Sequence, residues 1–121
     1  MKVSVSVAKS FKSAAKPLLK KYISLKNDLL RLEKDLIKNP RLGIPLGHSA
    51  YKIRLKISSK DKGKSGGARV ISLLETSIVS EIEKIDEEIF ITLITIYDKA
   101  DTASISDKEL KELINDFVKN G

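Results

Sequence analysis

Residues 51–71, YKIRLKISSKDKGKSGGARVI, constrain the fold of this chain more than any other stretch. Apolar and basic residues alternate from residue 51 to residue 57, which predicts a β-strand with one buried face and one cationic face. The cationic face carries Lys52, Arg54 and Lys56 and no acidic residue. A polar loop over residues 58–67 follows, and a second strand begins at Ala68 with Arg69 as its first charged side chain. Cations gathered on two neighbouring strands predict a site for a polyanion.

The cationic face also has a simpler interpretation, because antiparallel sheets commonly turn one polar face to solvent. The absence of acidic residues favours the polyanion site, since solvent-exposed surfaces usually mix charges of both signs. The loop adds three further lysines, Lys60, Lys62 and Lys64. We expect these and Lys52 to attract nucleic acid through its phosphates, without reading its sequence.

Length and residue content exclude several classes of protein. A chain of 121 residues is long enough for one domain with its own core, over residues 1–121. It has no cysteine and a single histidine, His48, so thiol chemistry is excluded and we expect neither a metal site nor a cofactor. No secretory signal or apolar span for a membrane is evident, so we expect a cytoplasmic protein.

The formal net charge of +7 is concentrated in one half of the chain. Residues 9–64 contain only four acids, whereas residues 75–88 contain six acids and a single lysine, Lys84. A basic half in a small protein indicates nucleic acid first, an acidic protein partner second, and a membrane only weakly.

Two helices are expected before the cationic strand. Residues 2–8 alternate valine with small residues and predict a strand with one buried face. The helix that starts at Ser10, its expected N-cap, should be short and should bend or break at Pro17. Residues 24–38 predict a longer helix with a leucine seam. The seam consists of Leu25, Leu29, Leu32 and Leu36.

The leucine seam has two interpretations. As a coiled coil it would join two copies of the chain, but it covers too few heptads, so we favour packing against the sheet. Residues 41–49 are rich in Pro and Gly and predict an ordered loop that contains His48. A single loop histidine is more often structural than catalytic.

The second half of the chain predicts strands and a final helix. Residues 68–74 and 89–97 indicate central strands, and residues 75–88 fit either a helix or, as we favour, the arm of a hairpin. Ser106 and Glu109 form a capping-box pattern at the start of the last helix. The predicted order is β-α-α-β-β-β-α, an α+β domain in which helices pack against an antiparallel sheet.

Three sequence features together resemble the RelE/ParE superfamily, toxins of bacterial type II toxin–antitoxin modules. The first is the order of the predicted helices and strands. The second is KIRLKI followed by KGKSGGARVI, and the third is IYDKAD before SISDKEL, as in toxins of the RelE and HigB kind. The resemblance covers nearly the whole chain. It implies a cognate antitoxin as partner and no small-molecule substrate.

For the nuclease branch of this superfamily, the resemblance implies ribosome-dependent cleavage of mRNA without a metal. In that chemistry the 2′-hydroxyl attacks the adjacent phosphate, and a base, an acid and positive charge around the phosphorane are needed. A cationic sheet face supplies the positive charge, and crowding among cations can lower the pKa of a lysine until it acts as a base.

The resemblance also assigns roles to individual residues. Arg69 matches the strand arginine that contacts the scissile phosphate, and Arg54 and Lys56 match basic residues that lead into the site. Lys99 is a looser match to the cation after the last strand. Tyr97, on the same strand face, is a candidate acid or base-stacking residue. The alternatives are an ion pair for Arg69 and a tyrosine at the edge of the core for Tyr97.

The chain departs from the nuclease pattern at its end, DFVKNG, where relatives often place a Tyr or His as the acid. The resemblance therefore leaves two alternatives to an mRNA endonuclease. One is a ParE-like toxin that inhibits DNA gyrase without nuclease activity, and the other is a decayed toxin retained for antitoxin binding. Fold alone does not choose among them.

Overall fold

The computed structural model describes residues 2–59, 67–78, 87–102 and 104–120. The fold is built on a five-stranded mixed sheet. Its strands are β1 (Lys2–Val7), β2 (Ile44–Gly47), β3 (Ala50–Leu55), β4 (Ala68–Ile78) and β5 (Glu87–Asp98). The helices of the described residues are α1 (Lys9–Lys21), α2 (Leu25–Lys38) and α3 (Asp107–Asn120). The α+β class predicted from the sequence is confirmed.

The strands lie in the order β1-β5-β4-β3-β2, which puts β4 at the centre, as predicted for the strand that starts at Ala68. The prediction of a purely antiparallel sheet is wrong at one edge, because β1 pairs with β5 in parallel. The alternating pattern of a strand specifies its buried face but not the direction of its neighbour. The connection through α1 and α2 carries the chain from β1 at one edge of the sheet to β2 at the other edge.

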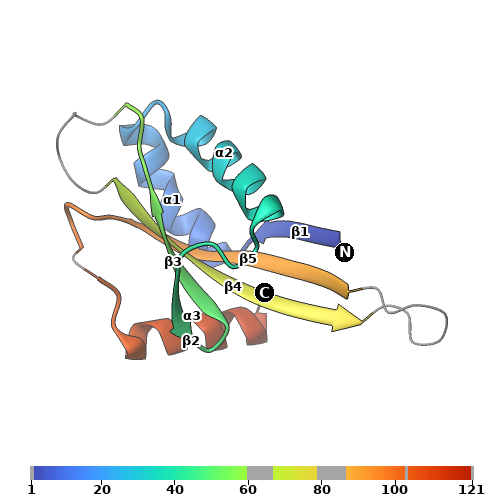
Figure 1. Cartoon of the computed structure of the whole chain (residues 1–121). Helices are drawn as coiled ribbons and strands as arrows, with labels where there is room; N and C mark the ends of the chain where they lie inside the picture. Colours follow the sequence, from blue (N-terminus) through green and yellow to red (C-terminus); the bar gives the residue numbers. More distant parts are fainter. Residues whose placement is uncertain (1, 60–66, 79–86, 103, 121) are drawn as a thin grey trace.

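Helices cover both faces of the sheet. Figure 1 shows α1 and α2 on one side and α3 on the other. The larger core lies between the sheet and α1 and α2, and it includes Phe11, Leu25 and Leu36. A smaller core joins α3 to the sheet through Leu110, Ile71 and Ile94. The sheet therefore has one heavily covered face and one lightly covered face.

The strand β2 was not predicted, since residues 41–49 have the composition of a loop. Pro45 lies in this edge strand, where a missing N–H is tolerated. The turn from β2 to β3 consists of His48 and Ser49, both with positive φ, 56° and 62°. Two such residues form the mirror-image turn that matches the twist of a hairpin, and its usual sequence is Asn-Gly. The chain therefore lacks the Asn-Gly sequence that would have indicated a hairpin turn at this position.

The first two helices also differ in detail from the predictions. α1 continues through Pro17 over 13 residues, and its N-cap position is Ala8 rather than Ser10. The burial of Phe11, Ala15 and Leu18 on one stripe supplies the stability that proline removes. In α2, three of the four seam leucines are buried against the domain's own core and Leu29 is partly buried, so the coiled-coil interpretation is wrong.

The predicted hairpin arm is confirmed in its described part. β4 and β5 stay paired out to Ser77 with Glu88 and Ile78 with Glu87, while residues 79–86 lie outside the described residues. The capping box is confirmed as well, because the Glu109 backbone N–H donates to Ser106 Oγ at 3.1 Å. No helix in the described part of the chain is long and apolar enough to cross a membrane.

Gly67 sets the point at which β4 begins beside β3. Its φ is +50°, and a Cβ added there would collide with the backbone carbonyl oxygen of Leu55. Its own carbonyl accepts a hydrogen bond from the Lys99 backbone N–H at 3.1 Å. Gly67 therefore fixes where three neighbouring strands meet, two residues before Arg69.

We expect Gly67→Ala to lower the free energy of unfolding by about 1–3 kcal/mol more than Gly47→Ala does. Gly47 is a matched control, since its φ is also positive, at +86°, but an added Cβ would have open space. Urea unfolding of both variants measures the difference. Equal losses would show that the close approach at Gly67 does not matter.

Candidate nucleic-acid interface

Three of the predicted site residues lie in one row across the sheet. Arg54 on β3 pairs in register with Arg69 on β4, and Arg69 pairs with Tyr97 on β5. Side chains that are directly opposite on neighbouring strands point to the same face, with strands roughly 4.8 Å apart. The sheet therefore brings together three residues that are separated by up to 43 positions in the chain. We call Arg54, Arg69 and Tyr97 the cross-strand row.

The cross-strand row lies on the face that α3 partly covers. The next row along the same face is Lys52, Ile71 and Thr95, and Ile71 packs against Leu110 of α3. The prediction that β3 has one apolar and one cationic face is confirmed, because Ile53 and Leu55 are buried on the opposite face. The sequence did not reveal that a helix would lie over part of the cationic face.

Exposure differs along the cross-strand row. Arg54 is exposed, whereas Arg69 is only 8% exposed. The Arg69 guanidinium donates a hydrogen bond to the backbone carbonyl of Ala68 at 3.2 Å. Arg69 is therefore held against the backbone of β4, with little of its side chain in contact with water.

The Tyr97 hydroxyl is buried and has no hydrogen-bond partner among the residues that the structure describes. Burial raises the pKa of this hydroxyl, and the nearby Ile105 backbone and the Arg69 guanidinium offset that effect only in part. Tyr97 is therefore protonated at neutral pH. A protonated phenol can donate a proton or a hydrogen bond, which is what an acid in this position needs.

A cavity of about 500 Å³ adjoins the cross-strand row, between the end of β5 and α3. Its lining combines aromatic, hydroxyl, carboxylate and aliphatic side chains. They belong to Thr95, Tyr97, Thr102, Ile105, Glu109, Glu112 and Leu113. Among these, only Tyr97 was singled out for the site from the sequence. Glu109 and Glu112 stand three positions apart on a helix, a spacing that indicates a shared face but not what that face meets.

The other predicted cations lie around the cross-strand row rather than in it. Lys52 is half-buried on β3, and Lys56 is exposed just beyond the end of that strand. Lys99 lies in the turn that follows β5, where its backbone continues the pairing with Gly67. The loop lysines Lys60, Lys62 and Lys64 lie outside the described residues.

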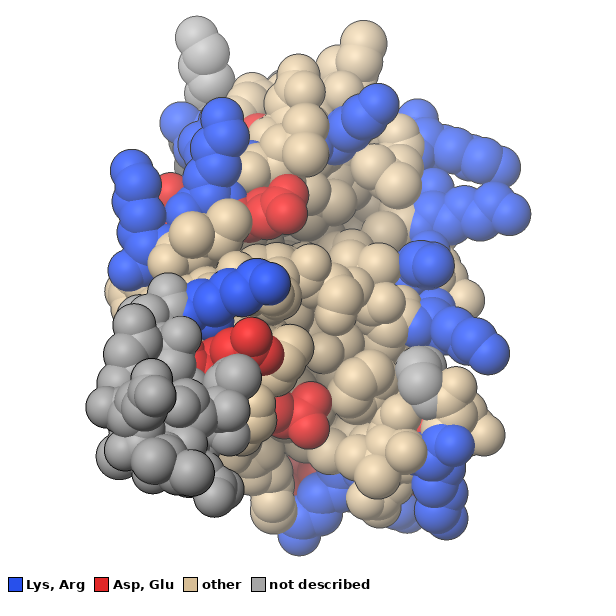
Figure 2. Space-filling model, turned by 90° about the vertical axis from the view of Figure 1, so that its right-hand side faces the viewer, with Lys and Arg blue, Asp and Glu red and all other residues tan. Residues whose placement is uncertain are grey.

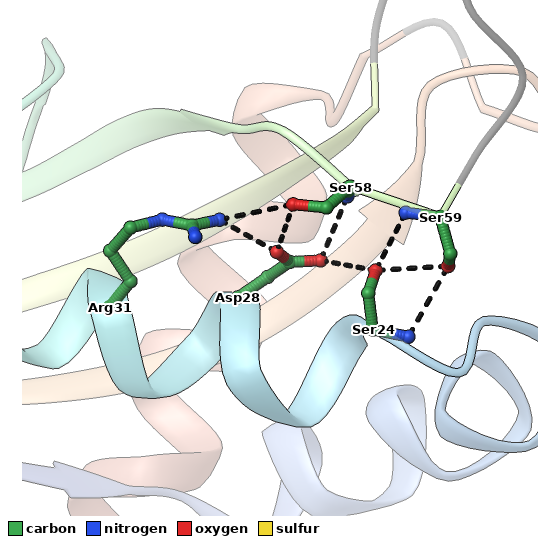
Figure 3. A network of polar contacts seen from close by, with 5 residues as sticks. All are labelled: Ser24, Asp28, Arg31, Ser58 and Ser59. Carbon is green, nitrogen blue, oxygen red and sulfur yellow. Dashed lines mark hydrogen bonds and ion pairs between the residues drawn. The ribbon is translucent and has the colours of Figure 1, made fainter.

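A polar network anchors the chain where β3 leads into the lysine-containing loop. Figure 3 shows Asp28 of α2 at its centre, surrounded by Ser24, Arg31, Ser58 and Ser59. Asp28 accepts hydrogen bonds from the Ser58 side chain at 2.7 Å and from the Ser58 backbone at 3.0 Å. Arg31 donates to it at 2.6 Å, and Ser24 at 2.8 Å. The network therefore joins the first turns of α2 to residues 58 and 59.

Asp28 is charged in spite of being buried, with 1% of its side chain exposed. Burial by itself would raise its pKa, but the hydrogen bonds from Ser58, Ser24 and Arg31 outweigh that effect and the pKa is lowered. A carboxylate that accepts several hydrogen bonds is stable inside a protein only while all of them are present. No local sequence pattern indicates this network, since Asp28 and Ser58 are 30 residues apart.

A second cavity, also of about 500 Å³, lies on the other face of the sheet, between β1, α1 and α2. We call it the β1 groove. Its lining is mostly apolar and includes Val7, Leu19 and Leu30, which are between 41% and 49% exposed. The helix α1 at this groove contains five lysines and no acid. Figure 2 shows the side of the molecule on the right of Figure 1, with Lys and Arg along both margins and acidic side chains beside a broad uncharged area between them.

The described residues contain no group of three or more His, Asp or Glu side chains that could hold a metal ion. Comparisons of the chain with protein-family models, with curated proteins and with solved structures gave no match.

We expect Asp28→Asn to lower the free energy of unfolding by about 2–4 kcal/mol, because an amide cannot accept all four hydrogen bonds. Since the folded pKa lies below the ordinary 3.8, the wild-type carboxylate stabilises the fold above that pH and ceases to do so as the pH falls through the lower folded value. Denaturant unfolding at pH 7 and at low pH should therefore show a variant whose deficit shrinks in acid.

Asp35→Asn is the matched control, since Asp35 is an exposed acid on the same helix. It should change the unfolding free energy at pH 7 by less than about 0.5 kcal/mol. A similar loss in both variants, or a deficit of Asp28→Asn that does not change with pH, would contradict the role given to this network.

Proposed function

We propose that the protein is the toxin of a type II toxin–antitoxin module, of the RelE/ParE superfamily, and that it cleaves mRNA on the ribosome in the cytoplasm. The main observation in support of this proposal is the cross-strand row. It combines two guanidinium groups and a protonated phenol on one sheet face, next to a cavity. The net charge of +7 supports a nucleic-acid substrate.

The chemistry proposed needs no group beyond the chain and the RNA. The 2′-hydroxyl loses its proton to a base and its oxygen forms a bond to the adjacent phosphorus. The bond from phosphorus to the 5′-oxygen of the next nucleotide breaks, and that oxygen takes up a proton. The products are a 2′,3′-cyclic phosphate and a free 5′-hydroxyl.

The residues of the face divide these tasks. Arg54 and Arg69 stabilise the extra negative charge on the phosphorane, because planar guanidinium groups present two donors to its oxygens. Tyr97 is the candidate proton donor to the leaving oxygen, because its hydroxyl keeps its proton at neutral pH. Lys56, which follows β3 on the same side of the alternation as Arg54, is the candidate base. Lys52, Lys99 and the loop lysines add attraction for phosphates.

One observation favours an alternative, a toxin that inhibits DNA gyrase and cleaves nothing. Arg69 and the Tyr97 hydroxyl are buried, and a surface that only binds a protein does not require either group to reach a substrate. A decayed toxin retained for antitoxin binding predicts the same burial. Cellular assays separate the three possibilities.

Expression of the protein without its antitoxin should arrest bacterial growth by cutting translated messages. Arg69→Lys should abolish the arrest, since a single ammonium group cannot replace the two donors and the loss of one preorganised donor costs about 3 kcal/mol. Arg69→Ala should do the same. Primer extension of messages, with thermal unfolding of each purified variant, measures both cleavage and folding.

Lys34→Ala is the control for this experiment, since Lys34 is an exposed cation on α2, on the other side of the sheet. Full toxicity of a folded Arg69→Lys would show that the site is wrongly assigned. Cleavage of a message with a 2′-deoxy nucleotide at the cut position would contradict the mechanism. Arrest with intact messages and gyrase-dependent DNA breaks would establish the alternative.

The antitoxin is expected to bring an acidic amphipathic helix to the β1 groove. The apolar lining matches the apolar face of such a helix, and the lysines of α1 match its acidic flanks. Association should slow steeply as salt is raised, because charge steering is screened. Leu30→Asp should weaken the complex about a hundredfold or more, by losing apolar contact and adding a repelling charge.

Ile37→Asp tests whether the groove itself is responsible. Ile37 is as exposed as Leu30, at 48% against 49%, and lies on the same helix but does not line the groove. Surface plasmon resonance with the antitoxin from the adjacent reading frame gives both rates. Equal effects of the two substitutions, or an association rate independent of salt, would show that the antitoxin binds elsewhere.

A further inference from the structure

The cavity beside Tyr97 lies within one nucleotide's reach of the two arginines. Tyr97 belongs both to the cavity lining and to the cross-strand row, and Arg69 is its direct neighbour one strand away. Neighbouring strands are roughly 4.8 Å apart, so a phosphate at Arg54 and Arg69 would leave the attached base at the mouth of the cavity. A volume of about 500 Å³ is large enough for a purine ring.

The lining differs in charge from the rest of the face. Beside a row of cations it presents two carboxylates, Glu109 and Glu112, both from α3. Glu109 is already engaged, because its carboxylate accepts hydrogen bonds from the backbone and the hydroxyl of Ser106 at 3.3 Å and 3.0 Å. Glu112 is exposed, and it has no hydrogen-bond or ion-pair partner among the described residues. A free carboxylate next to a site for a polyanion repels it unless it meets a hydrogen-bond donor of the same ligand.

We propose that this cavity binds a guanine base and that the Glu112 carboxylate recognises it. The proposal rests on the proposed function, in which Arg54 and Arg69 hold the adjoining phosphate. Tyr97 and Leu113 then form the flat and aliphatic walls on which the base stacks. The residues that would select the nucleotide come from α3, while those that would cleave it come from the sheet.

The choice of guanine follows from hydrogen-bond chemistry. A carboxylate only accepts hydrogen bonds, and its two oxygens suit two adjacent donors. The Watson–Crick edge of guanine offers such a pair, the N1–H and the N2 amino group. Adenine and cytosine place a ring acceptor beside their single amino group, and uracil has one N–H between two carbonyl oxygens. Each of those three would direct a lone pair at Glu112, a mismatch that lowers affinity by about tenfold or more.

Nucleotide binding by the intact protein tests the proposal directly. Guanosine, inosine, adenosine, cytidine and uridine 5′-monophosphates are titrated into the isotope-labelled protein, and the amide shifts are followed by NMR. We expect GMP to bind at least about tenfold more tightly than AMP, CMP and UMP, with shifts centred on Thr95, Tyr97 and Glu112. IMP, which lacks the N2 amino group, should bind several-fold more weakly than GMP.

Two variants assign the preference to one side chain. Glu112→Gln keeps the size of the residue but turns one acceptor into a donor, so it should abolish the preference of GMP over IMP. Asp116→Asn is the control, because Asp116 lies one turn further along α3, outside the cavity lining, where it accepts a hydrogen bond from Asn120. Equal affinities for all five nucleotides, or no shift at the cavity at millimolar GMP, would overturn the proposal. Loss of the preference in both variants would do so too.

The test of guanine binding can fail or succeed independently of the test of mRNA cleavage. If messages are cut but guanine is not enriched at the cut positions, and Glu112→Gln leaves the cut positions unchanged, the guanine assignment fails while the nuclease stands. If no message is cut, the nuclease proposal fails, and the NMR titration alone decides whether the cavity prefers guanine. Binding of an arginine-containing peptide in place of GMP would show that Glu109 and Glu112 recognise a protein instead.

Discussion

The pairing of β3, β4 and β5 is the constraint on which the rest of the structure depends. Arg54, Arg69 and Tyr97 are neighbours only because two registers are fixed at once, and a slip by one residue would turn a side chain to the other face. Gly67 holds β4 at the position that these registers need, since no other residue fits against the Leu55 carbonyl at that φ. Asp28 holds the segment after β3 in place from the other side of the sheet.

The two faces of the sheet divide stability from function. The face toward α1 and α2 contains the larger core and the buried Asp28 network. The face toward α3 contains the smaller core, the cross-strand row and the cavity with its two carboxylates. A cationic surface built into a core would be costly, because each buried charge loses its hydration. The cations lie on the lightly covered face, where Arg54 stays hydrated. Of the two arginines in the cross-strand row, only Arg69 loses its hydration.

The sequence predicted much of this arrangement, and the reasons for its failures are physical. Alternation identified β3 and its cationic face, and helical spacing identified α2 and α3, because both patterns depend on neighbours in the chain. β2 was missed because its turn uses His48 and Ser49 instead of Asn-Gly. The parallel edge at β1, the burial of Arg69 and the cavity at Glu112 depend on contacts between distant segments, which no local pattern encodes. The cation Arg69 was found, but its burial was not.

The light packing of α3 bears on how the buried Tyr97 hydroxyl can serve a substrate. Of its 14 residues only Leu110 is buried, and its other core contacts, Leu113, Ile114 and Phe117, are partly buried. Segments that bury few apolar side chains have the lowest free energy of local opening, well below that of the whole domain. Moving α3 therefore costs far less free energy than disturbing α1 or α2, and it would widen the cavity that α3 and β5 line around Tyr97. Because the cavity lies between α3 and β5, a ligand that occupies it would bind to both elements and stabilise their arrangement in return.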